Sequence, residues 1–301
     1  MDNKIIKVIK YFSFFGYYPT LNEIYTFLEA KISINSLEKK INKMVKEKLL
    51  LASKYTPPQY SIGKSKDQPR SNRGQRSTPI KSGSKIKNSE KKLNNWRFRL
   101  YMRLISLFSQ IKLVGLSGSI SMMNADTDDD IDLFIITERN RLFTGRLIAL
   151  ILAQLFGLRR SRGIGNNNNK ICLNLFFDEK SMKVPKFKQT EFVGHEVLQM
   201  KPIVNKETTY KRFLASNKWV FRLFPNSKQI FSRLNQDLIL SKKLKIKNEK
   251  LGDWIESRLR SFQMKSINKH KTTEIITNTQ LWFHPDDFEK KLPYLDKADS
   301  I

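Results

Sequence analysis

The sequence has little of several features that would quickly narrow its function. It contains one cysteine in 301 residues, which excludes an internal disulfide and suits the reducing cytoplasm, where we expect the protein to reside. It has three histidines and no HxxxH pair, so neither His195-Glu196 nor the segment 284–287 predicts a zinc site. Its N-terminus lacks the continuous apolar stretch of a signal peptide.

Long apolar runs are also scarce. The most apolar segment, 142–158, spans about 17 residues and contains Arg146 and Gln154, which is marginal for crossing a bilayer. We therefore expect no membrane span there, and predict a buried helix that packs on a sheet.

Acidic residues are few relative to basic ones. The chain holds 56 Lys and Arg against 28 Asp and Glu, a formal net charge of +28. Such an excess predicts attraction to polyanions such as nucleic acid or nucleotide phosphates. Lysine-rich codon usage in an AT-rich genome would explain it equally well.

The first 62 residues predict a small helical domain. Three amphipathic segments precede a hairpin with a proline-containing turn, and Thr20 with Glu23 forms a capping box. Three helices followed by a hairpin resemble a winged helix. Lys39 and Lys43 on the third helix are candidate nucleic-acid contacts. A protein-binding or purely structural role remains an equal alternative.

Residues 63–92 contain almost no large apolar side chains. They hold ten Lys and Arg against two acids, together with Gly, Ser, Pro and Asn. A segment of this composition buries too little surface to offset its ordering entropy, so we predict a disordered basic linker.

The most informative stretch is 111–137. An apolar strand leads into Gly118-Ser119, and a second strand opens with Asp130-Ile131-Asp132. Alternation along a strand places Asp130 and Asp132 on one face. Two adjacent carboxylates suit Mg²⁺, and a Gly-Ser turn offers backbone N–H groups and a hydroxyl to phosphates. The motif therefore predicts a metal–triphosphate site.

This motif resembles that of the nucleotidyltransferase superfamily that includes DNA polymerase beta. The resemblance implies a minimal nucleotidyltransferase α/β (α+β) fold with a mixed sheet over 93–185, one or two Mg²⁺ ions and a nucleoside triphosphate (NTP) substrate. It implies that Asp130 and Asp132 are catalytic metal ligands and that Gly118 and Ser119 bind the nucleotide. The family's third strand usually supplies a third carboxylate; here that position is Asn174.

Further candidates follow from position. Asn174 or Asp178, four residues on, could complete the metal shell, and Arg141 or Arg146 could reach the triphosphate. Residues 186–301 predict a mostly helical C-terminal region. The order of segments, including HEVLQMKP, resembles a group of uncharacterised bacterial nucleotidyltransferase-domain proteins.

Three functions remain open. The first is Mg²⁺-dependent transfer of a nucleoside monophosphate (NMP) from an NTP to a hydroxyl of an unknown acceptor, with release of pyrophosphate. The second is a non-catalytic regulator that binds nucleotide or nucleic acid through the winged helix. The third is an antitoxin-like modifier of a partner protein.

Overall fold

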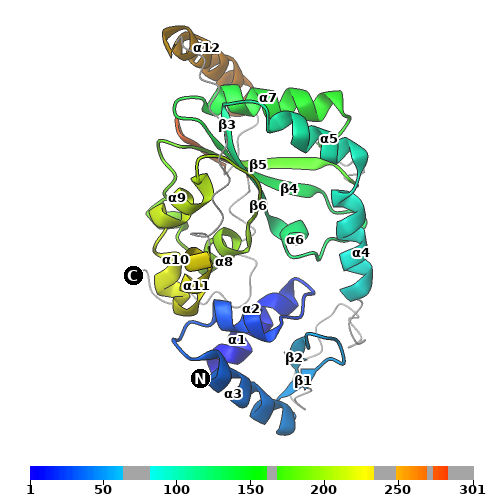
Figure 1. The fold of residues 1–301 in the computed structure, drawn as a ribbon. Coiled ribbons are helices and arrows are strands. Elements are labelled where there is room, and N and C mark those ends of the chain that lie inside the picture. The colour runs from blue at the N-terminus through cyan, green and yellow to red at the C-terminus, as the bar shows by residue number, and fades with distance from the viewer. Residues whose placement is uncertain (64–81, 161–167, 234–248, 270–273, 284–301) are drawn as a thin grey trace. The chain divides into compact units, whose positions relative to one another are not determined.

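The computed structural model describes residues 1–63, 82–160, 168–233, 249–269 and 274–283 (Figure 1). Their contacts divide the chain into two compact units. The described part of the first unit is 1–63, 82–84 and 218–233, and that of the second is 85–160, 168–217, 249–269 and 274–283. No helix among these residues is long and apolar enough to cross a membrane.

The first unit begins with three helices and a two-stranded antiparallel sheet. The helices are α1 (Asp2–Phe14), α2 (Leu21–Phe27) and α3 (Ile34–Lys46), and the strands are β1 (Leu50–Ala52) and β2 (Tyr60–Ile62). The predicted capping box is present, because the Thr20 hydroxyl accepts from the Glu23 N–H and Glu23 accepts from the Thr20 N–H.

A second segment, far along the chain, completes this unit. It comprises α10 (Val220–Leu223), η2 (Pro225–Ser227) and α11 (Lys228–Arg233). Asn226 donates to the carbonyls of Tyr25 and Ala30, and the rings of Phe27 and Phe224 lie 5.3 Å apart. The unit that we predicted as 1–62 therefore also includes residues 218–233, which we had assigned to the C-terminal region.

The second unit is built on a mixed six-stranded sheet in the order β6-β3-β4-β5-β8-β7. Its strands are β3 (Ile111–Leu116), β4 (Ile131–Thr137), β5 (Ile171–Asp178), β6 (Lys201–Asn205), β7 (Ile275–Ile276) and β8 (Gln280–Trp282). Strands β4 and β5 are parallel and the other pairs are antiparallel. The region predicted as mostly helical thus contributes three strands. They were missed because each is short.

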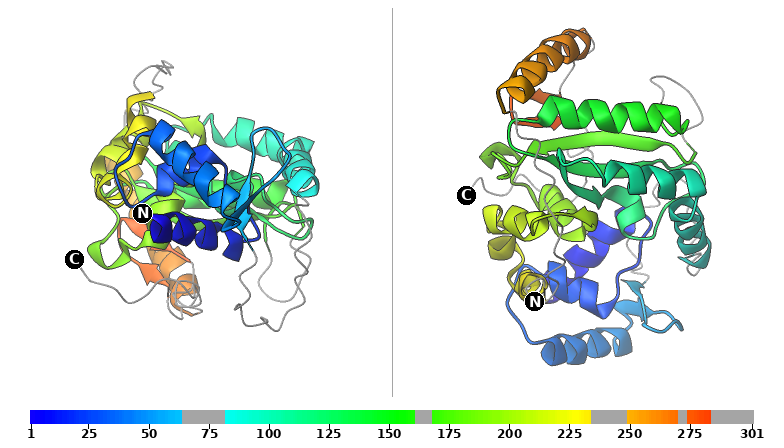
Figure 2. Two further views of the ribbon diagram at one scale, coloured as in Figure 1. Left: turned by 90° about the horizontal axis from the view of Figure 1, so that it is seen from below. Right: turned by 45° about the horizontal axis from the view of Figure 1, so that its top comes forward.

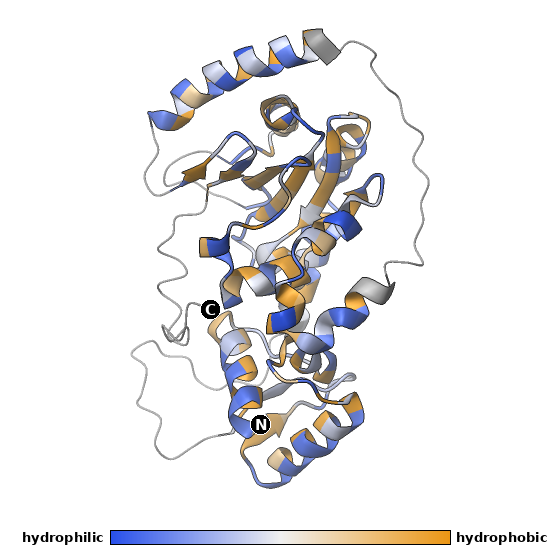
Figure 3. Ribbon diagram, turned by 90° about the vertical axis from the view of Figure 1, so that its left-hand side faces the viewer, coloured by the Kyte–Doolittle hydropathy of each residue, from blue (hydrophilic) through white to orange (hydrophobic). Residues whose placement is uncertain are grey.

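Helices cover both faces of this sheet (Figure 2). One face packs against α5 (Trp96–Ile105) and α7 (Leu142–Leu155), and α12 (Glu249–Asn268) lies against α7. The other face meets α9 (Thr209–Ser216), where Phe213 packs beside Phe134 and Phe177. Burial on both sides explains why the central strands β3 and β4 are hydrophobic over most of their length (Figure 3).

The predicted linker is partly wrong. Residues Ser82–Leu93 form helix α4, while 64–81 lie outside the described residues. The helix is fixed at Ser89, whose buried hydroxyl accepts from the N–H of Ala125, and at Lys92, which is 2% exposed. A composition this poor in apolar residues still forms a helix because Ser89 and Lys92 are buried within the second unit, to which they belong.

Candidate functional site

The Gly-Ser turn lies directly after β3, in the short helix α6 (Gly118–Ser121). Gly118 has φ of +60°, and a Cβ added there would lie 2.5 Å from Oδ2 of Asp132. A side chain is therefore disfavoured twice, by the left-handed backbone and by the carboxylate beside it. The glycine lets the turn approach the carboxylate that opens the next strand.

Asp130 and Asp132 converge at the beginning of β4, as the strand alternation predicts. A carboxylate oxygen from each lies with Sγ of Cys172 in a group whose members are all within 4.8 Å of one another. Cys172 pairs with Asp132 across the parallel β4–β5 ladder and so lies on the same face. The start of β4, the start of β5 and the end of β3 together define what we call the Asp130 end of the sheet.

The charge at this end is incompletely compensated. Burial, followed by the neighbouring carboxylates Asp130 and Glu196, raises the pKa of Asp132 well above its usual range. Two carboxylates held this closely gain from a cation between them, and oxygen ligands suit Mg²⁺. The residues present therefore fit a divalent cation.

Asn174 contacts Asp132 without replacing the missing carboxylate. Its Nδ2 donates to Oδ1 of Asp132 at 2.9 Å, and its Oδ1 accepts from Sγ of Cys172 at 2.5 Å. Burial raises the pKa of the Cys172 thiol, which keeps it protonated and able to donate. Because its oxygen faces the thiol, Asn174 positions Asp132 and is not oriented as a metal ligand.

Arg160 completes a network that joins the two carboxylates. Its Nη1 lies 2.7 Å from Oδ2 of Asp130 and 3.3 Å from Sγ of Cys172. Hydrogen bonds thus run without a break from Asp130 through Arg160, Cys172 and Asn174 to Asp132. Sequence reasoning overlooked Arg160 because only the tertiary fold brings residue 160 to the start of β4.

A third carboxylate, Glu196, also reaches this end. It lies on α8 (Glu191–Gln199), and its Oε2 accepts from the N–H of Gly118 at 3.3 Å. Burial raises its pKa, and the Gly118 hydrogen bond opposes that shift. Helix α8 leads into β6, whose Lys201 pairs with Leu116 at the end of β3. An acid in the EFVGHEVL segment was the available sequence signal. Without the prediction of β6, it could not be placed.

The acidic loop before β4 is held by its own partners. Asp129 accepts from the Ser119 hydroxyl at 2.9 Å and from the N–H of Asp126 at 3.0 Å. Lys92 of α4 donates to the carbonyls of Thr127 and Asp129. Burial lowers the pKa of Lys92, and the aspartates of the loop oppose this. Part of the acidic cluster therefore shapes the loop and only its last members face the site.

Asp178 lies at the opposite end of the sheet. In the β4–β5 register it pairs with Thr137, whereas Cys172 pairs with Asp132, and six residues of strand span roughly 20 Å. An extra residue in β5 also reverses the alternation, since Phe176 joins the core below α7 while Phe177 faces Phe134. Asp178 therefore cannot complete the metal shell.

Arg141 and Arg146 also belong to that far end. Arg141 pairs with Asp253 of α12 at 2.6 Å, and Arg146 donates to Gln263 of the same helix at 2.6 Å. Glu256 of α12 accepts from the N–H groups of the first turn of α7. Both arginines thus fasten α12 to α7, and the structure does not bring them to Asp130.

Lys39 and Lys43 lie in the first unit, on the exposed side of α3. The buried stripe of this helix is Leu37, Ile41 and Met44, as its periodicity predicts. Nζ of Lys43 lies 3.7 Å from Glu47, an exposed pair that contributes little.

Comparison of the chain with protein-family models, with curated proteins and with solved structures finds no match.

Proposed function

We propose that the protein is a nucleotidyltransferase that moves an NMP from an NTP to an acceptor hydroxyl and releases pyrophosphate. The observation that carries the proposal is the convergence of the Asp130 and Asp132 carboxylates beside the Gly118 turn. The strand–Gly-Ser–strand order supports the finer assignment of the second unit to the minimal nucleotidyltransferase fold. The three helices and hairpin of the first unit support its assignment as a winged helix.

Each group of the site has a role in this proposal. Asp130 and Asp132 would hold one or two Mg²⁺ ions, whose charge would offset that of the phosphates and of the entering oxygen. The Gly118-Ser119 turn would hold the β- and γ-phosphates, for which the Gly118 N–H and the Ser119 hydroxyl must exchange their present acceptors, Glu196 and Asp129, for phosphate oxygens. Asn174 and Cys172 keep Asp132 in one orientation. Glu196 takes the place that the family gives to a carboxylate of the third strand.

The reaction forms a bond between the acceptor oxygen and the α-phosphorus and breaks the bond from that phosphorus to the bridging oxygen of pyrophosphate. The proton of the acceptor hydroxyl passes to the carboxylate of Glu196 and then to solvent. A raised pKa suits this carboxylate to accepting a proton.

Label transfer tests the proposal. Each of the four α-³²P NTPs is incubated with Mg²⁺ and with tRNA, the protein itself or lysate as acceptor. We expect label with the wild type and with Asp253→Asn, an exposed aspartate on α12, and none with Asp130→Asn or Asp132→Asn. Equal labelling by all four proteins would place the activity elsewhere. No labelling by any of them would reject the transferase.

A regulatory function is the second candidate, favoured by the exposed lysines of α3. Lys39, Lys43 and Lys46 lie on the solvent side of a helix that a two-stranded wing follows. In this case Lys39→Gln/Lys43→Gln weakens binding to DNA or RNA, whereas Asp132→Asn leaves it unchanged. Fluorescence anisotropy with random-sequence duplexes measures both, and equal binding by all variants rejects it.

A further inference from the structure

We propose that Arg160 is an internal counter-ion of Asp130 that a divalent cation displaces when it binds between Asp130 and Asp132. The inference rests on the proposed function, because it concerns the metal which that function requires. It assigns to Arg160 a part that the nucleotidyltransferase resemblance does not give to any residue at this position.

Arg160 contacts Asp130 directly. Nη1 of Arg160 and Oδ2 of Asp130 are 2.7 Å apart, and the Asp130 side chain is only 18% exposed. The carboxylate is thus largely withdrawn from water, and the guanidinium supplies the compensation that water cannot. A guanidinium has five donors, no acceptor and a permanent charge, so it cannot itself ligate a metal.

Charge makes the two cations competitors. A divalent ion bound by Asp130 and Asp132 would lie within a few ångströms of the guanidinium of Arg160. The two cations would repel each other even if each bound a different carboxylate oxygen of Asp130. The Arg160 side chain is 46% exposed, so it can leave the carboxylate for solvent. Asp130 is therefore compensated by Arg160 without metal and by the metal once it binds.

The hydrogen-bond network shows where the exchange occurs. Asn174 holds Asp132 and Cys172 holds Asn174, and both of these bonds can persist when metal binds. The bond between Arg160 and Asp130 cannot persist without placing two positive groups together. Metal binding thus breaks the network at its one exposed member and leaves the buried members in place.

Binding of Mn²⁺ alone tests the exchange, with free Mn²⁺ measured by electron paramagnetic resonance. Because the pair with Asp130 no longer opposes the metal, Arg160→Gln should bind Mn²⁺ about fivefold more tightly than the wild type. The matched control is Arg159→Gln, which removes the same charge from the neighbouring exposed residue and should bind as the wild type. An Arg160→Gln affinity equal to or weaker than that of Arg159→Gln overturns the proposal.

Thermal unfolding supplies a second readout. Without metal, Arg160→Gln should melt below the wild type, because Asp130 and Asp132 repel each other uncompensated; Mn²⁺ should raise its Tm more than that of the wild type. A variant that is unfolded in EDTA yet folds with Mn²⁺ also supports the exchange. One that stays unfolded in both conditions overturns it.

Asp130→Asn and Asp132→Asn separate this inference from the proposed function. If both lose Mn²⁺ binding while Arg160→Gln gains none, only the role of Arg160 is wrong. If both bind Mn²⁺ as the wild type does, the metal lies elsewhere, and the transferase proposal falls together with the exchange.

Discussion

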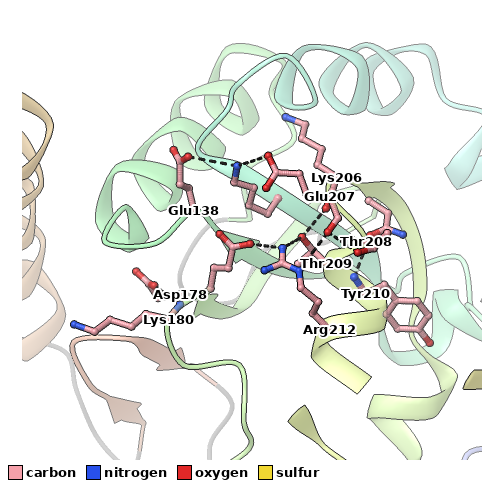
Figure 4. A network of polar contacts seen from close by, with 12 residues as sticks. Glu138, Asp178, Lys180, Lys206, Glu207, Thr208, Thr209, Tyr210 and Arg212 are labelled. Carbon is pink, nitrogen blue, oxygen red and sulfur yellow. Dashed lines mark hydrogen bonds and ion pairs between the residues drawn. The ribbon is translucent and has the colours of Figure 1, made fainter. Parts of the chain in front are cut away.

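The two ends of the parallel pair β4 and β5 both carry charged side chains, but they differ in how far those charges compensate one another. At the Asp130 end, Asp130, Asp132 and Glu196 crowd around one glycine turn with Arg160 as the compensating cation. At the other end, which we call the Asp178 end, acidic and basic side chains form ion pairs with one another (Figure 4).

The Asp178 end shows how a fold neutralises buried charge. Nζ of Lys112, in a side chain 7% exposed, lies 3.3 Å from Glu138 and 3.2 Å from Glu207. Arg212 pairs with Glu179. Among the described residues, Asp178 has no such cation. It accepts from the N–H of Lys180 at 2.7 Å, and backbone donors at Asn140 and Arg141 also lower its pKa against burial.

The difference separates charge that other side chains of the fold already compensate from charge that a ligand could compensate. Ion pairs that satisfy both partners stabilise one geometry and leave nothing for a ligand to gain. Carboxylates that repel each other raise the free energy of the empty site, and this free energy is recovered when a cation binds. In this chain, Asp132, whose perturbing neighbours are also carboxylates, is therefore a better candidate for a functional site than Asp178.

The largest expected effect is at Asp132. We expect Asp132→Asn to reduce label transfer about 1,000-fold, equivalent to roughly 4 kcal/mol, because a ligand of the proposed metal ion is lost. The same change should stabilise the metal-free protein by about 1 kcal/mol, since an amide removes the repulsion with Asp130 and Glu196. Urea unfolding in EDTA measures the second effect. A destabilised variant would mean that Asp132 is a structural carboxylate like those of the other end.

The second prediction concerns pH at the Asp178 end. Burial raises the pKa of Asp178 from 3.8 to about 6, so the folded chain keeps this proton longer than the unfolded chain. Protonated Asp178 therefore contributes roughly 3 kcal/mol to the free energy of unfolding. This contribution is complete below pH 3.8 and is lost as the pH rises to about 6.

Asp178→Asn should remove this part of the pH dependence. Urea unfolding between pH 4.5 and 7.5 would show the variant gaining stability relative to the wild type as the pH rises, and Mg²⁺ should not alter that gain. Asp132 also titrates above its usual range, but there Mg²⁺ should offset the loss. A Mg²⁺-sensitive difference between Asp178→Asn and wild type would contradict the separation of the two ends.

The sequence correctly placed Asp130 and Asp132 close to Gly118 because this motif is local. Gly118, Ser119, Asp130 and Asp132 lie on consecutive elements, so strand alternation and one short connection bring them together. Glu196 and Arg160 could not be found this way, since one depends on the pairing of β6 with β3 and the other on the chain returning to β5. Asp178 was misplaced for two other reasons: it lies at the far end of β5, opposite Thr137, and a one-residue bulge that leaves no mark in the sequence turns it to the other face.

A smaller effect is expected at Gly118. Gly118→Ala should destabilise the protein by about 2 kcal/mol, because alanine pays for a positive φ and its Cβ would displace Asp132 Oδ2. Gly83→Ala is the matched control, since a Cβ there meets nothing within 4 Å; on α4 it should stabilise the protein by up to about 1 kcal/mol. Mn²⁺ should bind more weakly to Gly118→Ala and normally to Gly83→Ala.

The smallest effect is expected at Lys112, and it tests whether the Asp178 end is structural only. Lys112→Met retains the buried aliphatic stem but leaves Glu138 and Glu207 without their shared cation. Because both acids are about one-third exposed, water solvates them and limits the loss in the free energy of unfolding to about 1.5 kcal/mol. Lys180→Met, which removes a charge from the same end, should be neutral. Neither change should alter Mn²⁺ affinity by more than about twofold. The two lysines lie roughly 20 Å of strand from Asp130, which exceeds the Debye length of about 8 Å in physiological salt, so their charges are screened there. A larger change in affinity after Lys112→Met would mean that the two ends are coupled through the sheet.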